Sequence, residues 1–119
     1  MRNTDKLLFD IADAARLVDM FLAGVDRSTF DQDVKSQSAV LYQLTIIGEA
    51  VKLLPEEWRT QHPEIPWSQV GRMRDHLIHR YFSVDLDVLW DTATVDVSEL
   101  RKYLAPLVSP LLQDEPDQK

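Results

Sequence analysis

The sequence predicts an all-α fold, an antiparallel up-down bundle of four helices. Apolar residues recur at spacings of three and four along nearly the whole chain, which is the period of one face of an α-helix. No run of residues shows the alternation expected of a strand. At 119 residues the chain has the length of one domain with a buried core, so four amphipathic helices favour a bundle.

The first two predicted helices lie in the amino-terminal half. Along the first, the recurring apolar residues are Leu7, Ile11, Ala14, Val18 and Phe21. Gly24 is expected to end it. Along the second, they are Val40, Leu44, Ile47, Val51 and Leu54. This second set forms a heptad-like seam that Pro55 should stop.

The remaining two predicted helices flank residue 82. The third carries Trp67, Val70, Met73, Leu77 and Tyr81. The last begins near Asp85 or Asp87 and carries Leu86, Trp90, Ala93, Val97, Leu100 and Leu104. Pro106 and Pro110 are expected to end or kink it, because proline has no backbone N–H. Residues 1–113 are therefore expected to form the domain, and the polar residues 114–119 a disordered tail.

Composition narrows the class of protein. The chain has no cysteine, which excludes disulfides and thiolate metal sites and fits a reducing compartment. Asp10, Asp13 and Asp19 interrupt the apolar stretches near the amino terminus, so neither a signal peptide nor a membrane span is expected. A cytoplasmic protein with no membrane partner is the prediction.

Residues 74–81, here called the motif segment, gather the side chains best suited to chemistry. An arginine can fork onto a phosphate, and a histidine with an unperturbed pKa of roughly 6.5 can exchange a proton near neutrality. Arg74 and His79 are therefore the minimum equipment for cutting a phosphodiester without metal. A helix end with ordinary surface charges is the alternative, and spacing alone slightly favours that alternative.

The charge balance restricts which nucleic acids could bind. Twenty acidic against thirteen basic residues give a formal charge of -7, the wrong sign for general attraction to RNA. Between Arg72 and Tyr81, however, there are three arginines and one aspartate. A basic spot on an acidic body suits a selective nuclease better than a protein that coats nucleic acid.

Helix geometry places the two principal candidate residues, Arg74 and His79, on different sides of a straight helix. At about 100° per residue, the step from Arg74 to His79 turns roughly 140° around a straight helix, too far for both to reach one phosphate. Either the helix loosens near Ile78, or the groups meet those of a second subunit across a two-fold axis. The dimer is favoured, because internal attack needs a base and an acid and the motif supplies one histidine per chain. The heptad-like seam of the second helix also favours it.

Several motifs together resemble a known family. Arg74, His79 and Tyr81 match the pattern R-x-x-x-x-H-x-Y. Further matching pieces are residues 46–50 (IIGEA), 62–67 (HPEIPW) and 81–87 (YFSVDLD). In this order they resemble the HEPN superfamily, in particular the HepT-like toxins of HEPN and minimal-nucleotidyltransferase gene pairs. The resemblance covers residues 4 to 112 and departs at Asp75, where the family commonly has asparagine.

The resemblance implies a metal-independent endoribonuclease toxin that acts as a homodimer with a composite site. It implies that His79 moves protons, Arg74 holds the scissile phosphate, and a 2′,3′-cyclic phosphate results, without a cofactor. Tyr81 would be the residue on which a partner minimal nucleotidyltransferase, the antitoxin, places AMP. Asp75 and His76 are supporting candidates. Asp75 is as easily a solvated carboxylate beside His79, and His76 is more easily a surface histidine.

Three other interpretations stay open. The domain could be a non-catalytic module that presents substrate or nucleotide to a nucleotidyltransferase, or an inert interaction bundle, although neither needs the whole set Arg74, His79 and Tyr81. A zinc site at His76 and His79 is disfavoured, because no cysteine is present and one further histidine remains. The three tryptophans are expected to be core and staple residues rather than platforms for stacked bases: Trp58, Trp67 and Trp90.

Overall fold

The computed structural model describes residues 3–67, Val70 and residues 85–113. In chain order the helices are α1 (Asn3–Leu22), α2 (Arg27–Gln32), α3 (Val34–Leu53), α4 (Glu56–Thr60), α6 (Leu86–Asp91), the π-helix η1 (Thr92–Asp96) and α7 (Val97–Gln113). All the regular structure in these residues is helical, which confirms the predicted all-α class for this part of the chain. No helix among them is both long and apolar enough to cross a membrane.

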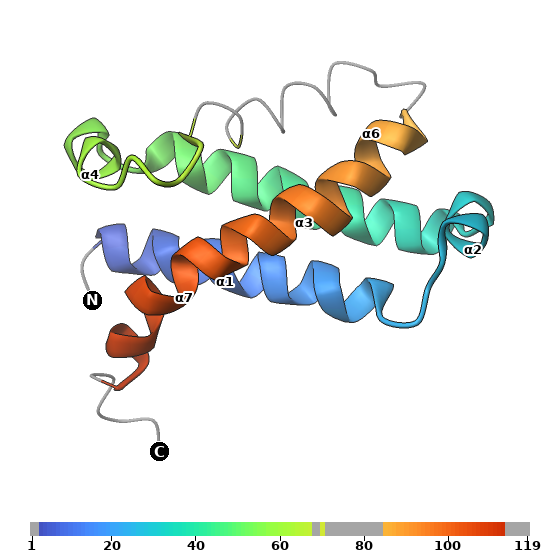
Figure 1. The fold of residues 1–119 in the computed structure, drawn as a ribbon, viewed down its shortest axis with the longest axis horizontal. Coiled ribbons are helices and arrows are strands. Elements are labelled where there is room, and N and C mark those ends of the chain that lie inside the picture. Colours follow the sequence, from blue (N-terminus) through green and yellow to red (C-terminus); the bar gives the residue numbers. More distant parts are fainter. Residues whose placement is uncertain (1–2, 68–69, 71–84, 114–119) are drawn as a thin grey trace.

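Helices α1 and α3 form an antiparallel pair (Figure 1). Gly24 ends the first of them as predicted, in a left-handed conformation with φ of 75° that an L side chain rarely adopts. The short α2 follows, with the Asp26 carboxylate accepting from the Thr29 backbone N–H at 2.8 Å. The Asp33 backbone N–H then closes α2 by donating to Phe30 O at 3.2 Å. The Asp33 carboxylate starts α3 by accepting from the Ser36 backbone N–H at 3.3 Å, and it also accepts from the Ser36 hydroxyl at 2.7 Å.

The last three helices follow one another without a break and cross the α1–α3 pair obliquely (Figure 1). The predicted start is confirmed, since α6 begins at Leu86 with Asp85 as its cap. The prolines were expected to end or kink the last helix, and they do not end it, because α7 runs through Pro106 and Pro110 to Gln113. Both prolines lie on the exposed side, where the carbonyl oxygens that lose an N–H donor can meet water.

The core lies where α1, α3 and the continuous α6–η1–α7 segment meet. All five residues of the heptad-like seam on α3 are at most 2% exposed: Val40, Leu44, Ile47, Val51 and Leu54. They belong to the same apolar cluster as Ile11 and Val18 of α1 and Leu100 of α7. The seam is therefore the core face of one chain, and it cannot be the dimer interface that a heptad pattern suggests.

The third predicted helix, from Trp67 to Tyr81, is the one that the structure describes least. Val70 is buried and its backbone N–H donates to Pro66 O at 3.0 Å, but most of residues 67–81 lie outside the described part. The four-helix bundle stays a prediction for that reason, and so does the domain limit at residue 113 with its polar tail.

Candidate functional site

The five predicted site residues, Arg74, Asp75, His76, His79 and Tyr81, all lie outside the described residues. Their mutual geometry therefore stays a prediction. The structure does describe the two chain segments that lead into and out of residues 71–84. Each is fixed by a specific set of contacts, and these contacts determine where the motif segment is attached to the core.

An aromatic anchor, made of Trp58, His62 and Trp67, holds the amino-terminal approach. The Trp67 indole N–H donates to the Arg59 carbonyl at 3.0 Å and to the His62 carbonyl at 2.9 Å. His62 stacks on Trp58 with ring centroids 3.9 Å apart, and Trp67 meets Trp58 edge-on at 5.7 Å. Next to them Ile65 is 2% exposed. The loop after α4 is thus held both by ring contacts among these side chains and by the hydrogen bonds from the Trp67 indole to backbone carbonyls.

The role of His62 follows from its hydrogen bond. Nδ1 lies 2.9 Å from the Trp58 carbonyl oxygen, which can only accept, so Nδ1 carries the proton and donates. This hydrogen bond and the stacking on Trp58 orient the His62 imidazole, which gives it a structural role. His62 is the one histidine in the described part, and no group of three His, Asp or Glu side chains there is placed to hold a metal ion.

The expectation for the tryptophans is confirmed. Trp58, Trp67 and Trp90 are each partly buried and packed against the apolar core. Two of them belong to the aromatic anchor, and Trp90 contacts the buried Phe30 at a centroid distance of 5.1 Å. Their rings are engaged with protein on at least one side, as core and staple residues require.

The carboxyl-terminal exit is held at the start of α6. The Asp85 carboxylate accepts from the backbone N–H groups of Asp87 at 3.0 Å and Val88 at 3.3 Å, which caps the helix. One turn on, Leu89 is fully buried. The chain that leaves the motif segment therefore enters a capped helix whose first turn is already inserted into the core.

Arg27 ties this helix to α2. Its guanidinium donates to Asp31 and to Asp87, both at 2.7 Å. Asp87 lies sixty positions after Arg27 in the chain. The two carboxylates, Asp31 first and then Asp87, raise the pKa of Arg27. Sequence reasoning missed this link. The spacing of Arg27 and Asp31 on one helix was a visible signal, whereas nothing in the spacing pointed to Asp87.

The acidic residues after the motif segment should repel a nearby phosphate less strongly than their number suggests. Asp85 is engaged as a cap and Asp87 is paired with Arg27. Asp96 is partly buried, and its pKa is raised by that burial first and then by the charges of Asp91 and Glu99. Two of the four aspartates that follow the motif thus have structural partners, which lessens their repulsion of a phosphate nearby.

Comparisons with known proteins agree with this architecture. Residues 11–107 match the model of the family described as "Ribonuclease HepT-like". The chain is 45% identical over 100 residues to "Probable ribonuclease HepT" of Thermococcus cleftensis, covering 84% of this chain and 91% of that protein. It is 39% identical to a "Putative RNase" of Methanocaldococcus jannaschii over 76% of this chain and 74% of the other, and 40% identical to a "Putative RNase" of Caldanaerobacter subterraneus over 71% and 76%. No solved structure matches.

Because residues 11–107 match this family model, the chain belongs to the HEPN superfamily of helical proteins. Within that class, the chain belongs to the HepT-like ribonuclease family. The matched residues include the whole motif segment, so the family predicted from R-x-x-x-x-H-x-Y and its companion motifs is confirmed.

Proposed function

We propose that this chain is a metal-independent endoribonuclease, the toxin of a cytoplasmic toxin–antitoxin pair, and that it acts as a homodimer. The observation that carries the proposal is the family match over residues 11–107, a range that contains the R-x-x-x-x-H-x-Y residues Arg74, His79 and Tyr81. The hydrogen bonds of Trp67 before residues 71–84 and the cap at Asp85 after them support it, because a catalytic group needs a rigid scaffold on either side.

Cleavage would proceed by internal attack. The His79 imidazole takes the proton of the ribose 2′-hydroxyl, and that oxygen forms a bond to phosphorus. The bond from phosphorus to the 5′-oxygen breaks, and the imidazolium of the partner subunit's His79 returns a proton to the leaving oxygen. The products are a 2′,3′-cyclic phosphate and a free 5′-hydroxyl. Arg74 stabilises the charge that develops on the phosphoryl oxygens, while Asp75 and His76 orient these groups.

The homodimer has support from a surface other than the seam. Val34, Tyr42 and Leu53 of α3 are 70%, 64% and 67% exposed. At about 100° per residue they fall within roughly 100° of one another around the helix, on an exposed side that they share with Ser38, Glu49 and Lys52. A second copy would remove these side chains from water and bring two motif segments into one site.

Silencing is proposed at Tyr81. A partner minimal nucleotidyltransferase would join the phenolic oxygen of Tyr81 to the α-phosphorus of ATP, with pyrophosphate leaving. The added phosphate charge and adenosine would lie two residues from His79 and exclude the RNA phosphate by repulsion and bulk.

Two single substitutions test catalysis. His79→Ala and Arg74→Ala should each abolish cleavage of RNA while the far-UV circular dichroism and the Tm stay unchanged, and His76→Ala should reduce cleavage without abolishing it. EDTA should leave the wild-type rate unaltered. An active His79→Ala protein, or complete inhibition by EDTA, would contradict the mechanism.

Mixing the two inactive variants tests the composite site. Heterodimers of Arg74→Ala and His79→Ala subunits should regain part of the activity, because the shared site would again hold one Arg74 and one His79, whereas each homodimer lacks one of the two groups altogether. The mass in solution, from light scattering, should be that of a dimer. A monomeric mass with no recovery would refute the dimer.

Modification is tested with the partner enzyme, ATP and Mg²⁺. Wild-type protein should gain one or more AMP units on Tyr81, by mass spectrometry of peptides, and should stop cleaving RNA. Tyr81→Phe keeps the ring and lacks the acceptor oxygen, so it should fold normally and escape modification. AMP found on another residue, with Tyr81 untouched, would refute this part of the proposal.

A further inference from the structure

The helix that follows the motif segment changes its hydrogen-bonding pattern between α6 and α7. In η1 the Val97 backbone N–H donates to the Thr92 carbonyl, five residues back, whereas an α-helix uses the carbonyl four residues back. Helices α6, η1 and α7 still run on without a break (Figure 1). The turn in η1 therefore holds one residue more than an α-helical turn, and this rotates α6 by about 100° relative to α7.

The apolar pattern of the sequence fits a helix without this additional residue. Two sets of apolar residues recur every seven positions: Leu86, Ala93 and Leu100, and Trp90, Val97 and Leu104. Seven residues make almost two α-helical turns, with a drift of roughly 20°. In a continuous α-helix both sets would therefore lie on one buried face.

The structure buries a different pair of residues in this part of the helix. Leu89 and Thr92 are 0% and 7% exposed, whereas Leu86 and Trp90 are only partly buried. Leu89 lies eight positions before Val97, and the additional residue in η1 makes these eight positions equivalent to seven. The chain thus fits two registers, and the observed one buries a leucine and a threonine in place of a leucine and a tryptophan.

Two contacts of α6 stabilise the observed register. Arg27 of α2 donates to Asp87 at 2.7 Å. Trp90 contacts Phe30 of α2, with ring centroids 5.1 Å apart. Because Asp87 and Trp90 both belong to α6, a rotation of this helix by about 100° would break both contacts.

Like charges oppose the observed register. Asp91 and Asp96 are five positions apart, and Asp91 and Glu99 are eight apart. The additional residue in η1 places all three carboxylates on one side of the helix. In agreement, the pKa of Asp96 is raised by burial first, and then by the charges of Asp91 and Glu99. In an α-helical register Asp91 would turn about 100° away from the other two.

Side-chain hydroxyls lower the cost of exchanging one register for the other. The Thr94 hydroxyl donates to the Trp90 carbonyl at 2.8 Å, and the Ser98 hydroxyl donates to the Thr94 carbonyl at 3.0 Å. Serine and threonine make such bonds to the carbonyl four residues back within α-helices as well. The two carbonyls therefore keep a donor while the backbone N–H groups change partners.

We propose that residues 92–96 are a register switch between the observed π-turn and an α-helical turn. In the α-helical register α6 rotates by about 100° and moves about 1.5 Å along its axis relative to α7. Leu86 and Trp90 enter the core, and Asp87 leaves Arg27. Asp85, which joins the motif segment to α6, moves with the helix. The exchange itself is independent of the proposed ribonuclease function, and its effect on cleavage rests on that function.

Relaxation-dispersion NMR of the full chain tests the exchange, because it detects motions on the scale of microseconds to milliseconds. We expect dispersion at the amides of residues 86–97, from a minor state of roughly 0.1–10%. The chemical shifts of that state should equal those of a variant in which Val95 is deleted, because its turn has one residue fewer. Val95 is 56% exposed, so the deletion removes no core side chain. Val95→Ala is the matched control, since it shortens the side chain and keeps the π-turn.

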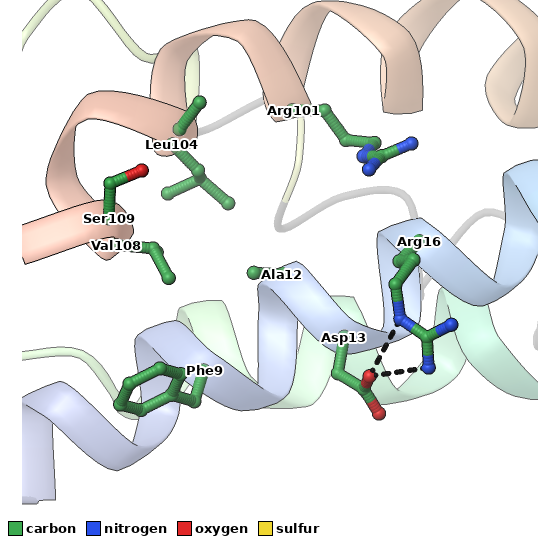
Figure 2. A pocket seen from close by; sticks show the side chains of 9 residues that line it. Phe9, Ala12, Asp13, Arg16, Arg101, Leu104, Val108 and Ser109 are labelled. Atoms are coloured by element: carbon green, nitrogen blue, oxygen red, sulfur yellow. Dashed lines mark hydrogen bonds and ion pairs between the residues drawn. The ribbon is translucent and has the colours of Figure 1, made fainter. Parts of the chain in front are cut away.

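Two substitutions should shift the minor population in opposite directions. Arg27→Gln removes a contact that holds α6, so it should raise the population up to about fivefold, the effect of an exposed ion pair. Asp96→Asn removes the central carboxylate charge, so it should lower the population roughly twofold. Two controls should change nothing. Arg16→Gln loses an exposed ion pair with Asp13 at the rim of the pocket between α1 and α7 (Figure 2), and Glu56→Gln loses an exposed carboxylate on α4.

The outcomes separate the switch from the proposed ribonuclease function, because the NMR measurements need no RNA. Absence of dispersion at residues 86–97 in both the wild type and Arg27→Gln would overturn the switch, and so would equal effects of Arg27→Gln and Arg16→Gln. If the deletion variant does not fold, opposite shifts in Arg27→Gln and Asp96→Asn support the switch and shifts of the same sign refute it. In the cleavage assay the deletion variant should be on the order of 100-fold slower than Val95→Ala, and equal rates would show that the rotation of α6 does not reach the site.

Discussion

Replacing Trp67 by phenylalanine tests how firmly the approach to the motif segment is anchored. Phenylalanine keeps an aromatic ring beside Trp58 but has no N–H, so the carbonyls of Arg59 and His62 lose their shared donor. Both acceptors are in a partly buried setting. Both oxygens keep a backbone donor, since Arg59 O accepts from the His62 N–H at 3.1 Å and His62 O from the Ile65 N–H at 3.3 Å. The lost indole hydrogen bond therefore costs roughly 1 kcal/mol of unfolding free energy. The ratio of folded to unfolded protein would fall about fivefold.

Unfolding in urea, followed by circular dichroism, measures this loss, and Trp90→Phe is the matched control. That substitution removes the same part of the ring, yet no hydrogen bond from the Trp90 indole occurs among the described residues. Trp67→Phe should therefore unfold with roughly 1 kcal/mol less free energy than Trp90→Phe, a Tm difference of roughly 4 °C for a chain of this length. If the two variants were equally stable, the indole hydrogen bonds would contribute nothing, and the anchoring argument would fail.

Three further substitutions probe the described part of the fold. Asp96→Asn should raise the Tm at pH 7, because the folded state raises the pKa of this carboxyl and so disfavours its charge; the gain should shrink as the pH falls toward 3.8. Asp33→Ala should do the reverse in the same calorimetric pH series, since hydrogen bonds from Ser36 lower the pKa of Asp33 and its stabilisation is lost only in acid. Ile47→Ala should cost roughly 2–5 kcal/mol in urea unfolding by opening a cavity at a fully buried position, and a cost below 1 kcal/mol would show that the site collapses.

The sequence predicted the long helices because each presents an apolar face over many turns. α1 and α3 have twenty residues each, enough for the spacing of three and four to repeat. α2 and α4, with six and five residues, give no period to detect. The π-helix has no apolar signature either, since Thr92 and Ala93 continue the pattern of the helix before it.

The seam on α3 shows a second limit of pattern reasoning. Spacing identifies which face of a helix is buried, but it does not say whether the partner belongs to the same chain. Val40 and Ile47 pack in the core with Ile11 of α1, so the burial that a heptad pattern predicts is real and intramolecular. Exposed Tyr42 and Leu53 carry no periodic signal at all, and only the structure makes them candidates for an interface.

Contacts distant along the chain were equally invisible to the sequence. Arg27 pairs with Asp87 and Arg101 with Asp19, eighty-two residues away in the second case. Such pairs depend on how the helices cross, which no local sequence pattern specifies. The motif residues themselves were found by resemblance, because their spacing alone fits an ordinary helix end as well as a site.

The distribution of charge reconciles an acidic chain with an RNA substrate, if the proposed function holds. Residues 71–84 have three arginines and one aspartate, which leaves ten basic and nineteen acidic residues elsewhere. Of the basic side chains in the described part, Lys6, Arg16, Arg27 and Arg101 each pair with a carboxylate. By sequence, residues 71–84 are thus the part of the chain where arginine outnumbers aspartate, whereas acidic residues outnumber basic ones elsewhere. RNA would be attracted at that place and repelled over the rest of the surface, so few phosphates would be contacted and selectivity would come from the shape of the RNA around the scissile bond.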